Sequence, residues 1–379
     1  MPHALLSASS AHRWMNCPPS ARLTEAIADT TSPYAAEGTL AHEIGELILT
    51  KYLRCADSPD KWERIKAHEL FYDGMLDEVS IYTDYVIEQF NAAVQAAGDP
   101  LIFLETKLDF STYVPDGYGT GDCIIIADGQ MEIVDLKFGK GVEVSAVNNP
   151  QLMLYALGAY EQFGFIYDIQ TIKMTIAQVR LNHISSSIIT PDMLLDWAEN
   201  TVKPIAALAF EGKGEQTPGE WCRFCKIKAD CQARADQNLA FIEANKGKRI
   251  TIKRLADILT QADEITSWIS DIKELALTKA LEGTEIPGFK LVEGRSNRQI
   301  TDEAALAQIL AQNISEPEKI YKPKTLETIT ALEKLFGKKR FAELAKDYVI
   351  KPPGKPTLVP ISDKRPALNS PEDDFNFDM

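Results

Sequence analysis

Hydrophobic and polar positions between residues 122 and 137 predict a β-hairpin. An apolar run opens the segment, and the Asp128-Gly129 pair then has the composition of a tight turn. Side chains alternate between the two faces of the strand that follows, so Asp135 and Lys137 fall on the same face. The pattern therefore predicts a hairpin that carries a carboxylate and a lysine side by side.

Helical periodicity predicts helices on both sides of this hairpin. Residues 38–53 carry apolar side chains on two opposite faces, so we expect a helix that is buried on both sides and carries His42. A helix from about residue 149 to 163 brings Gln151 and Tyr155 to one side, because they are four positions apart. The other expected elements are a short helix that stops before Pro18, a helix over 75–97, strands over 101–110 and 169–181, and helices over 191–211 and 252–282.

Size and composition fit a soluble protein with more than one domain. The 379 residues are 45% hydrophobic and 25% charged, and no apolar run approaches the roughly 18 residues that span a bilayer. We expect a cytoplasmic protein with no membrane partner, since the first residues lack the apolar core of a signal peptide. The expected divisions are a core domain over residues 1–245, a helical accessory domain over 250–348 and a Pro-rich, acidic, disordered tail over 349–379.

The charge distribution is uneven. A net charge of −15 argues against a protein that coats nucleic acid through its overall charge. The segment from Cys222 to Arg254 departs from this average, because it holds nine basic residues against three acidic ones. This segment is either a solvated helix face or a local path for a nucleic-acid strand. Trp221 and Phe224 could stack on bases there, or they could pack around a metal site.

The hairpin has the residues of a hydrolytic metal site. Asp122 and Asp135 lie at strand ends that can meet across the hairpin, and Lys137 follows on the same face. Hydrolysis of a phosphodiester near pH 7 needs an activated water and neutralisation of the phosphate charge, and a divalent cation held by carboxylates provides both. Hairpins with such residues are more often merely solvated, so the hairpin alone indicates only a candidate metal site.

Six cysteines are too few for a disulfide scaffold in a chain of this length, and clustered cysteines more often bind metal. Cys222, Cys225 and Cys231 supply three ligands at close spacing, and three do not close a tetrahedral site. Cys17, far upstream, is the candidate for the fourth. Four thiolates suit structural Zn²⁺ or an iron–sulfur centre equally, and unliganded thiols are the third alternative.

The order of these motifs resembles the PD-(D/E)XK nuclease superfamily, in particular its RecB-like branch. That branch contains the nuclease domains of the RecBCD and AddAB helicase–nucleases and the four-cysteine exonucleases associated with CRISPR loci. The resemblance covers roughly residues 1–240. It rests on a helical His42, a Gly-x-x-Asp ending at Asp122, the Asp135-x-Lys137 pair, Gln151-x-x-x-Tyr155, and one early cysteine followed by a late triplet.

The resemblance implies an α/β fold with a restriction-endonuclease-like core, in which helices flank a mixed central sheet, and a mostly helical C-terminal accessory domain. It implies Mg²⁺ or Mn²⁺ at the acidic site and a 4Fe–4S cluster on the cysteines. The implied metal ligands are His42, Asp122, Asp135 and the backbone carbonyl of Leu136. The implied catalytic residues are Asp122, Asp135, Lys137, Gln151, Tyr155 and, on the preceding strand, Glu105. The implied cluster ligands are Cys17, Cys222, Cys225 and Cys231.

The implied activity is that of a metal-dependent DNA exonuclease or end-processing nuclease. No phosphate loop of an ATP-driven motor is found, so we expect action on single-stranded or duplex DNA ends. Similarity to phage-encoded nuclease-like proteins implies a role in phage or prophage recombination or repair. The acidic tail is similar to docking tails of single-strand-binding proteins, which suggests a recombination partner, although a solvated end is the simpler interpretation. The alternative function is a non-catalytic scaffold that binds DNA ends on the same fold.

Overall fold

The computed structural model describes residues 4–28, 33–54, 58–247 and 249–292, together with isolated residues between 330 and 349. The chain divides into two compact units, residues 1–292 and 293–379. About half of the expected accessory domain over 250–348, and almost all of the tail over 349–379, lie outside the described residues. Those two boundaries therefore stay predictions.

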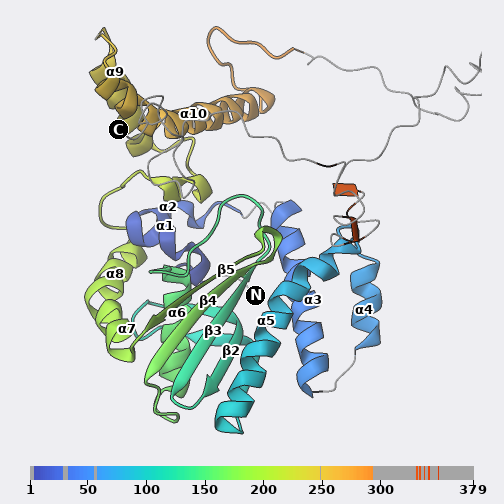
Figure 1. Ribbon diagram of the computed structural model, residues 1–379. Helices are drawn as coiled ribbons and strands as arrows, with labels where there is room; N and C mark the ends of the chain where they lie inside the picture. The colour runs from blue at the N-terminus through green and yellow to red at the C-terminus, as the bar shows by residue number, and fades with distance from the viewer. Residues whose placement is uncertain are drawn as a thin grey trace, which may run out of the picture. The chain divides into compact units, whose positions relative to one another are not determined.

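A five-stranded mixed sheet forms the centre of the first unit, with its strands in chain order (Figure 1). Neighbouring strands are antiparallel except β3 and β4, which are parallel. A parallel pair needs a crossover connection, and the helix between these strands provides it. The mixed sheet flanked by helices confirms the predicted fold class. The strands are β1 (Leu101–Asp109), β2 (Tyr118–Ala127), β3 (Gln130–Lys137), β4 (Thr171–Gln178) and β5 (His183–Ile189).

The β2–β3 hairpin has the two-residue turn that its sequence predicts. Asp128 and Gly129 both adopt positive φ, 47° and 71°, and this is the backbone that a type I′ hairpin turn requires. The turn fixes the register, so that Cys123 lies opposite Val134. One further step in the same register places Asp122 opposite Asp135.

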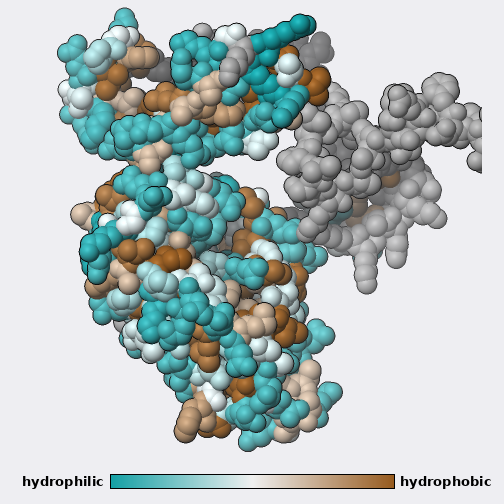
Figure 2. Space-filling view, turned by 90° about the vertical axis from the view of Figure 1, so that its left-hand side faces the viewer, coloured by the Kyte–Doolittle hydropathy of each residue, from teal (hydrophilic) through white to brown (hydrophobic). Residues whose placement is uncertain are grey.

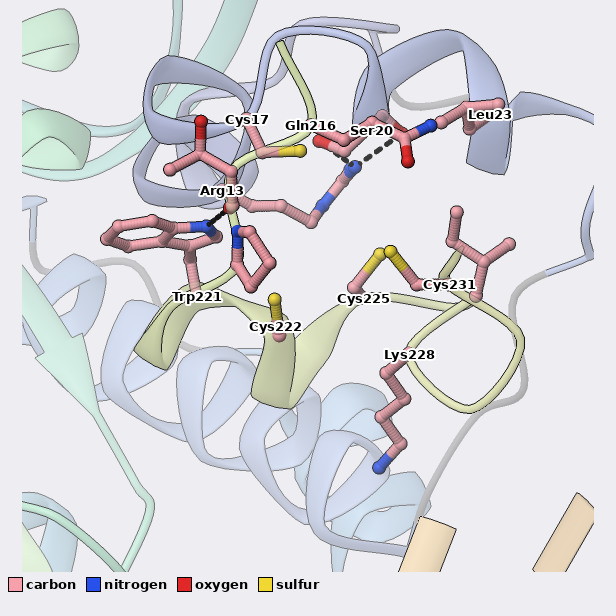
Figure 3. Close-up of a pocket in the computed structure, with 13 residues that line it drawn as sticks. Arg13, Cys17, Ser20, Leu23, Gln216, Trp221, Cys222, Cys225, Lys228 and Cys231 are labelled. Atoms are coloured by element: carbon pink, nitrogen blue, oxygen red, sulfur yellow. Dashed lines mark hydrogen bonds between the residues drawn. The ribbon is translucent and has the colours of Figure 1, made fainter. Parts of the chain in front are cut away.

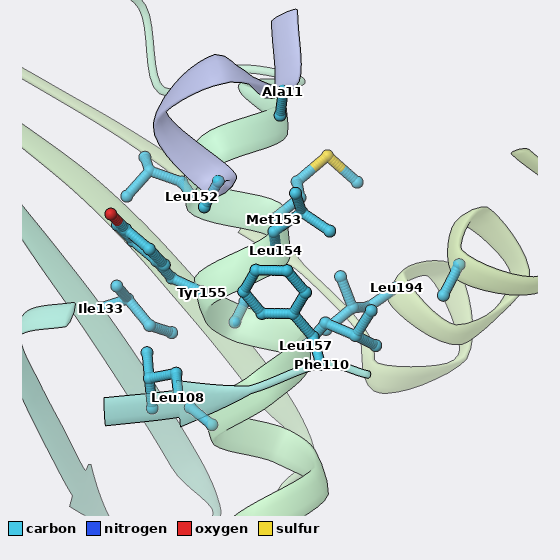
Figure 4. Close-up of a cluster of buried hydrophobic side chains, with 14 of the residues drawn as sticks. Ala11, Leu108, Phe110, Ile133, Leu152, Met153, Leu154, Tyr155, Leu157 and Leu194 are labelled. Atoms are coloured by element: carbon cyan, nitrogen blue, oxygen red, sulfur yellow. The ribbon is translucent and has the colours of Figure 1, made fainter. Parts of the chain in front are cut away.

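Helices cover both faces of the sheet. On one face, α6 (Pro150–Phe163) packs against β1, β2 and β3, and Met131 and Ile133 contribute to the apolar cluster beneath it (Figures 1 and 4). On the other face, α3 (Pro33–Arg54) and α5 (Gly74–Ala97) pack over a second cluster that contains Val134 and Leu136. The predicted alternation of β3 between its two faces is therefore confirmed.

The start of α6 is fixed by a strong cap. Asn149 Oδ1 accepts hydrogen bonds from the amides of Gln151 and Leu152, at 3.1 and 3.2 Å, and Pro150 occupies the first helical position, where its missing amide costs nothing. Along the helix, Gly158 lies directly on β1, because a Cβ there would come within 3.0 Å of Leu108 Cβ. The cap and this close contact set the position of Gln151 relative to the sheet.

The remaining elements show where the sequence pattern was misleading. The segment over 191–211 is a helix as predicted, but a π-helical turn interrupts it. Helix α4 and strand β5 were not predicted. The other described helices are η1 (Ala8–Ser10), α1 (Ala11–Asn16), α2 (Ser20–Glu25), α4 (Pro59–Lys66), η2 (Val179–Leu181), α7 (Pro191–Trp197), the π turn η3 (Ala198–Val202), α8 (Lys203–Glu211), η4 (Glu220–Phe224), α9 (Gln232–Asn245) and α10 (Ile252–Leu281).

The face of the molecule in Figure 2 is largely polar. Hydrophilic residues predominate on the face shown in Figure 2, and hydrophobic residues are scattered among them. Among the residues that the structure describes, none of the helices combines the length and the apolar character needed to cross a membrane.

Candidate active site

Three metal-binding side chains converge from three different elements. His42 comes from α3, Glu105 from β1 and Asp122 from β2, and one potential ligand atom of each lies within 4.8 Å of the other two. His42 Nδ1 is 3.3 Å from Asp122 Oδ1 and 3.9 Å from Glu105 Oε1. His42 thus meets two residues that lie more than 60 positions further along the sequence, in the combination that the motif order predicts.

Glu105 reaches this point through an unusual backbone conformation. Its φ is +45° in the middle of β1, a region that side-chain-bearing residues seldom adopt. The flanking residues Leu104 and Thr106 stay in register with β2, so the distortion is confined to one residue. Strained residues of this kind concentrate at functional sites, where the surrounding structure compensates for them.

The two aspartates of the hairpin occupy different environments. Asp122 Oδ2 accepts a hydrogen bond of 2.7 Å from the amide of Leu136, whose carbonyl was the predicted ligand. Asp135 is 2% exposed, and Lys137 Nζ lies 2.9 Å from its Oδ2. Despite this ion pair, Oδ2 accepts no hydrogen bond of normal geometry. Asp135 therefore presents a buried carboxylate oxygen whose one close partner is the ammonium group of Lys137.

Gln151 connects the lysine to the aspartate. Its Oε1 accepts a hydrogen bond of 2.9 Å from Lys137 Nζ, and its Nε2 lies 3.1 Å from Asp135 Oδ1 and 3.2 Å from the Tyr155 hydroxyl. The ring of Tyr155 in turn lies against Gly119, where a Cβ would come 2.6 Å from Tyr155 Cε1. Lys137 is thereby held at a fixed position beside Asp135.

Crowded carboxylates dominate the electrostatics of the site. Burial raises the pKa of Asp135, although Lys137 beside it opposes the shift. Burial also raises the pKa of Glu105. Burial favours neutral His42, but Asp122, Glu105 and Asp135 outweigh it and raise the pKa of the imidazole to about 10. The charged forms of Asp135 and Glu105 are disfavoured by burial and by the charge of Asp122. Carboxylates in such a setting are well suited to binding a cation.

The sequence interpretation missed Arg180, which joins the elements around this site. Its guanidinium lies 4.7 Å from the ring centroid of Phe138, the residue that follows Lys137. It also forms ion pairs with Glu37 of α3 and Glu78 of α5. Arg180 thus ties the helix that carries His42 to the end of the strand that carries Lys137. The arginine follows an apolar strand without any motif around it, so the sequence offered no signal.

The four predicted ligand cysteines line one small cavity (Figure 3). Cys17 ends α1, Cys222 lies in η4, Cys225 follows η4, and Cys231 precedes α9. All four are free thiols rather than disulfides. Of the other cysteines, Cys123 is buried in the core under α3 and α5, and Cys55 lies outside the described residues.

The sulfur atoms of the cysteine cavity are not gathered as closely as the ligand atoms of the acidic site. Among the described residues, His42, Glu105 and Asp122 are the one group of three potential ligands with all ligand atoms within 4.8 Å of one another. No three of the sulfur atoms are therefore this close together. Thiolates that bind one Zn²⁺ ion would lie this close together, because each Zn–S bond is only about 2.3 Å long.

Two solved structures share a limited likeness with this chain. One is a protein from Eubacterium rectale that is provisionally named an exonuclease, with 14% identity, a TM-score of 0.35, and coverage of 66% of this chain and 92% of its own. The other is SSO0001, with 10% identity, a TM-score of 0.23, and coverage of 59% of this chain and 96% of its own. At such TM-scores neither likeness bears on function.

The comparison with protein families covers nearly the whole chain. A family model described as "Protein of unknown function (DUF2800)" matches residues 3–366. This match includes the acidic site, all four cysteines of the cavity and α10. The chain therefore belongs to the DUF2800 family.

Proposed function

We propose that this protein is a metal-dependent nuclease that hydrolyses phosphodiester bonds in DNA, in the manner of the RecB-like branch of the PD-(D/E)XK superfamily. The observation that carries the proposal is the convergence of His42, Glu105 and Asp122 beside the linked Asp135, Lys137 and Gln151. This convergence unites every side chain that the motif order singled out except the cysteines.

The residues present fit a divalent cation. Imidazole and carboxylate oxygens are suitable ligands for Mn²⁺, and the carboxylates alone suit Mg²⁺. Asp135 supplies a buried oxygen without a hydrogen bond, and Asp122 is oriented by the amide of Leu136. His42, Glu105 and Asp122 would hold the ion, with Asp135 beside them. When bound, the ion would neutralise charge on the phosphate and make a water more acidic.

Lys137 would act directly on the reacting groups. Its ammonium group is positioned by Asp135 and by Gln151 Oε1, which leaves a donor for a third partner. In this position it can donate a hydrogen bond to the attacking water or to a phosphate oxygen. Tyr155 and Gln151 would keep the lysine in place as the substrate binds.

We also propose that the four cysteines hold a 4Fe–4S cluster. What supports the proposal is that four free thiols from both ends of the core line one cavity, and four cysteine thiolates are the ligand set of such a cluster. Anaerobic purification should then give a coloured protein that contains iron and acid-labile sulfide. A colourless preparation that contains zinc and no iron would contradict this assignment in favour of structural zinc.

The test of the nuclease proposal is degradation of end-labelled single-stranded and duplex DNA with Mg²⁺ or Mn²⁺. Asp122→Ala and Lys137→Ala should each lower the rate at least about 100-fold. Lys140→Ala is the matched control, because Lys140 is an exposed lysine three residues further along the chain. We expect this control to cleave at the wild-type rate.

The same experiment separates the enzyme from a non-catalytic scaffold. A protein that binds DNA ends tightly but shows no metal-dependent cleavage under any of these conditions would be a scaffold on a nuclease fold. Cleavage that persists in both the Asp122→Ala and Lys137→Ala variants would show that the activity belongs to another site or to a contaminant.

A further inference from the structure

A groove of about 470 Å³ lies beside the cysteine cavity and has no part in the proposed chemistry. Its walls come from both ends of the core: the N-terminal residues that form η1 and α1, and the segment that carries the cysteine triplet. Its lining combines hydroxyl, aromatic and basic side chains, among them Ser7, Ser10, His12, Trp221, Phe224 and Lys226.

One wall of the groove is also the back of the candidate active site. Ala8 of η1 lies between the groove residues Ser7 and Ser9 and packs against Gly119, where a Cβ would be 3.6 Å from that of Ala8. The same position is in contact with the ring of Tyr155, whose hydroxyl is hydrogen-bonded to Gln151. This packing therefore places η1, one wall of the groove, against the residues that support Gln151.

The cysteine segment approaches the active site as well. Arg223 Nη2 lies 3.9 Å from the position of a Cβ on Gly141, in the loop that follows Lys137. Arg223 and Phe224 are both exposed; Arg223 reaches that loop, and Phe224 lines the groove. The path from the catalytic lysine to the groove is thus bordered by a cation.

The aromatic side chains of the groove have different roles. Trp221 is held in place, because its Nε1 donates a hydrogen bond of 2.7 Å to the carbonyl of Thr217 and its ring meets His12 edge-on. Phe224 is 81% exposed, and the guanidinium of Arg223 lies 5.6 Å from its ring centroid. An exposed aromatic ring beside an arginine is what proteins use to stack an unpaired base.

The polar groups of the groove suit a phosphodiester backbone. Lys226 brings a positive charge to the wall, and the hydroxyls of Ser7, Ser9 and Ser10 form a cluster with oxygen–oxygen distances of 2.9 and 3.2 Å. Of the acidic side chains nearby, Glu25 is paired with Arg22 at 3.0 Å, and Glu220 lies 3.6 Å from the imidazole of His12. A negatively charged, unpaired strand therefore meets donors and a stacking platform here.

We propose that this groove binds a single-stranded DNA segment that is continuous with the strand in the active site, with a base stacked on Phe224 and phosphates near Lys226 and Arg223. The proposal builds on the proposed nuclease function and adds to it the form of the substrate. A metal bound by the four cysteines would have a second role in this proposal. Because it joins the two ends of the core, it would also hold the two walls of the groove together.

The test measures binding separately from cleavage. A fluorescent 20-nucleotide single strand is titrated with the full-length protein in EDTA, and Kd is read by anisotropy. Phe224→Ala should weaken binding roughly tenfold, because stacking of one base is lost. Phe165→Ala is the matched control, since Phe165 is 100% exposed and lies after α6, outside this groove. Lys226→Gln should lower the slope of log Kd against log salt by about 0.7, the value for one phosphate contact on a single strand.

The outcomes distinguish this inference from the proposed function. If the wild type cleaves DNA but Phe224→Ala binds as tightly as Phe165→Ala, the groove is not the strand path and the nuclease proposal stands. If no metal allows cleavage but binding depends on Phe224, the inference that the groove binds a single strand is supported and the nuclease proposal fails. Equal affinity for a duplex of the same sequence without free single strands would also overturn the inference.

Discussion

Gln151 is the residue on which the geometry of the candidate active site depends most. Its amide contacts Lys137, Asp135 and Tyr155 at once. Gln151→Leu keeps the size of the side chain and removes all three hydrogen bonds. We expect kcat to fall about 10- to 100-fold, the usual loss when a group that orients catalytic residues is removed.

The control for this variant is Gln162→Leu, an exposed position on the same helix. DNA binding in EDTA should be unaffected in both variants, because Gln151 acts through Lys137 and Asp135. A Gln151→Leu enzyme with unchanged kcat would show that the lysine does not need to be oriented, and hence that it does not act on the reacting groups.

Residue identities at this site were predictable from the sequence, but their conformations were not. The order of His42, Asp122 and Lys137 is legible as a motif, because each belongs to a pattern with fixed spacing. The positive φ of Glu105 leaves no trace, since glutamate has no preference for that region. The contacts of Arg180 could not be predicted from the sequence either, because its partners Glu37 and Glu78 lie more than 100 positions away.

Glu105 allows a test of strain at the level of a single residue. Glu105→Gly should relieve a left-handed conformation that costs about 1–2 kcal/mol for a side-chain-bearing residue, and it removes one of the crowded carboxylates. The free energy of unfolding of the metal-free protein should therefore stay constant or rise, while metal-dependent cleavage falls. Lys107→Gly, on the same strand and exposed, should instead lose about 1 kcal/mol in denaturant unfolding. Equal destabilisation of both variants would contradict the strained conformation.

At the scale of whole elements, the sequence pattern succeeded where one face is apolar. Strands β2 and β3 and helices α5 and α6 lie within a few residues of their predicted bounds. Strand β5 was missed because its exposure alternates between intermediate and high, with three serines among its seven residues. Helix α4 was missed because its segment is polar, and Ile65 is its one buried residue. Edge elements of this kind bury too little apolar surface to be visible in a hydrophobic pattern.

The packing of α9 against α10 depends on a buried ion-pair network. Arg234 of α9, which is 1% exposed, forms ion pairs with Glu264 and Asp271 of α10, and Asp271 also pairs with Lys228 near the cysteines. Asp271→Asn should lower the free energy of unfolding by about 2 kcal/mol at pH 7, because the buried guanidinium loses a charged partner. Asp263→Asn, an exposed change on the same helix, should have no measurable effect.

The difference in the free energy of unfolding between the wild type and Asp271→Asn should become smaller in acid. Burial works against the Asp271 carboxylate, but Arg234 and Lys228 outweigh it and hold its pKa below the usual value. A depressed pKa in the folded state gives stability that is present above the unfolded pKa of about 4 and is lost as pH falls through the folded value. Urea unfolding from pH 7 to pH 3 should therefore show a constant gap between wild type and Asp271→Asn above about pH 5, and a narrowing gap below it. A gap that widens in acid would contradict the assignment.

At the scale of the molecule, the cysteine cavity joins the beginning of the core to its end. Cys17 belongs to the N-terminal helices, whereas the other three cysteines follow the last helix of the α/β core. Protein contacts support the same junction, since Arg22 donates a hydrogen bond to the carbonyl of Phe210 and Lys226 donates one to that of Ile27. A metal bound here would add a covalent link across about 200 residues, a loop whose closure entropy is large.

Loss of that link should destabilise the whole core rather than the cavity alone. Cys17→Ser leaves three thiolates, so we expect a lower iron content and a free energy of unfolding reduced by up to about 5 kcal/mol, the chain-entropy value for a link across a loop of this length. Removal of the metal from the wild type by a chelator should lower Tm to a similar extent, and the two effects should not add. Cys123→Ala is the control, because Cys123 lies in the core beneath α3 and α5 and not in the cavity. The iron content of this variant should equal that of the wild type. If Cys17→Ser retains full iron and unfolds like the wild type, Cys17 is not a ligand and the two ends of the core are held together by protein contacts alone.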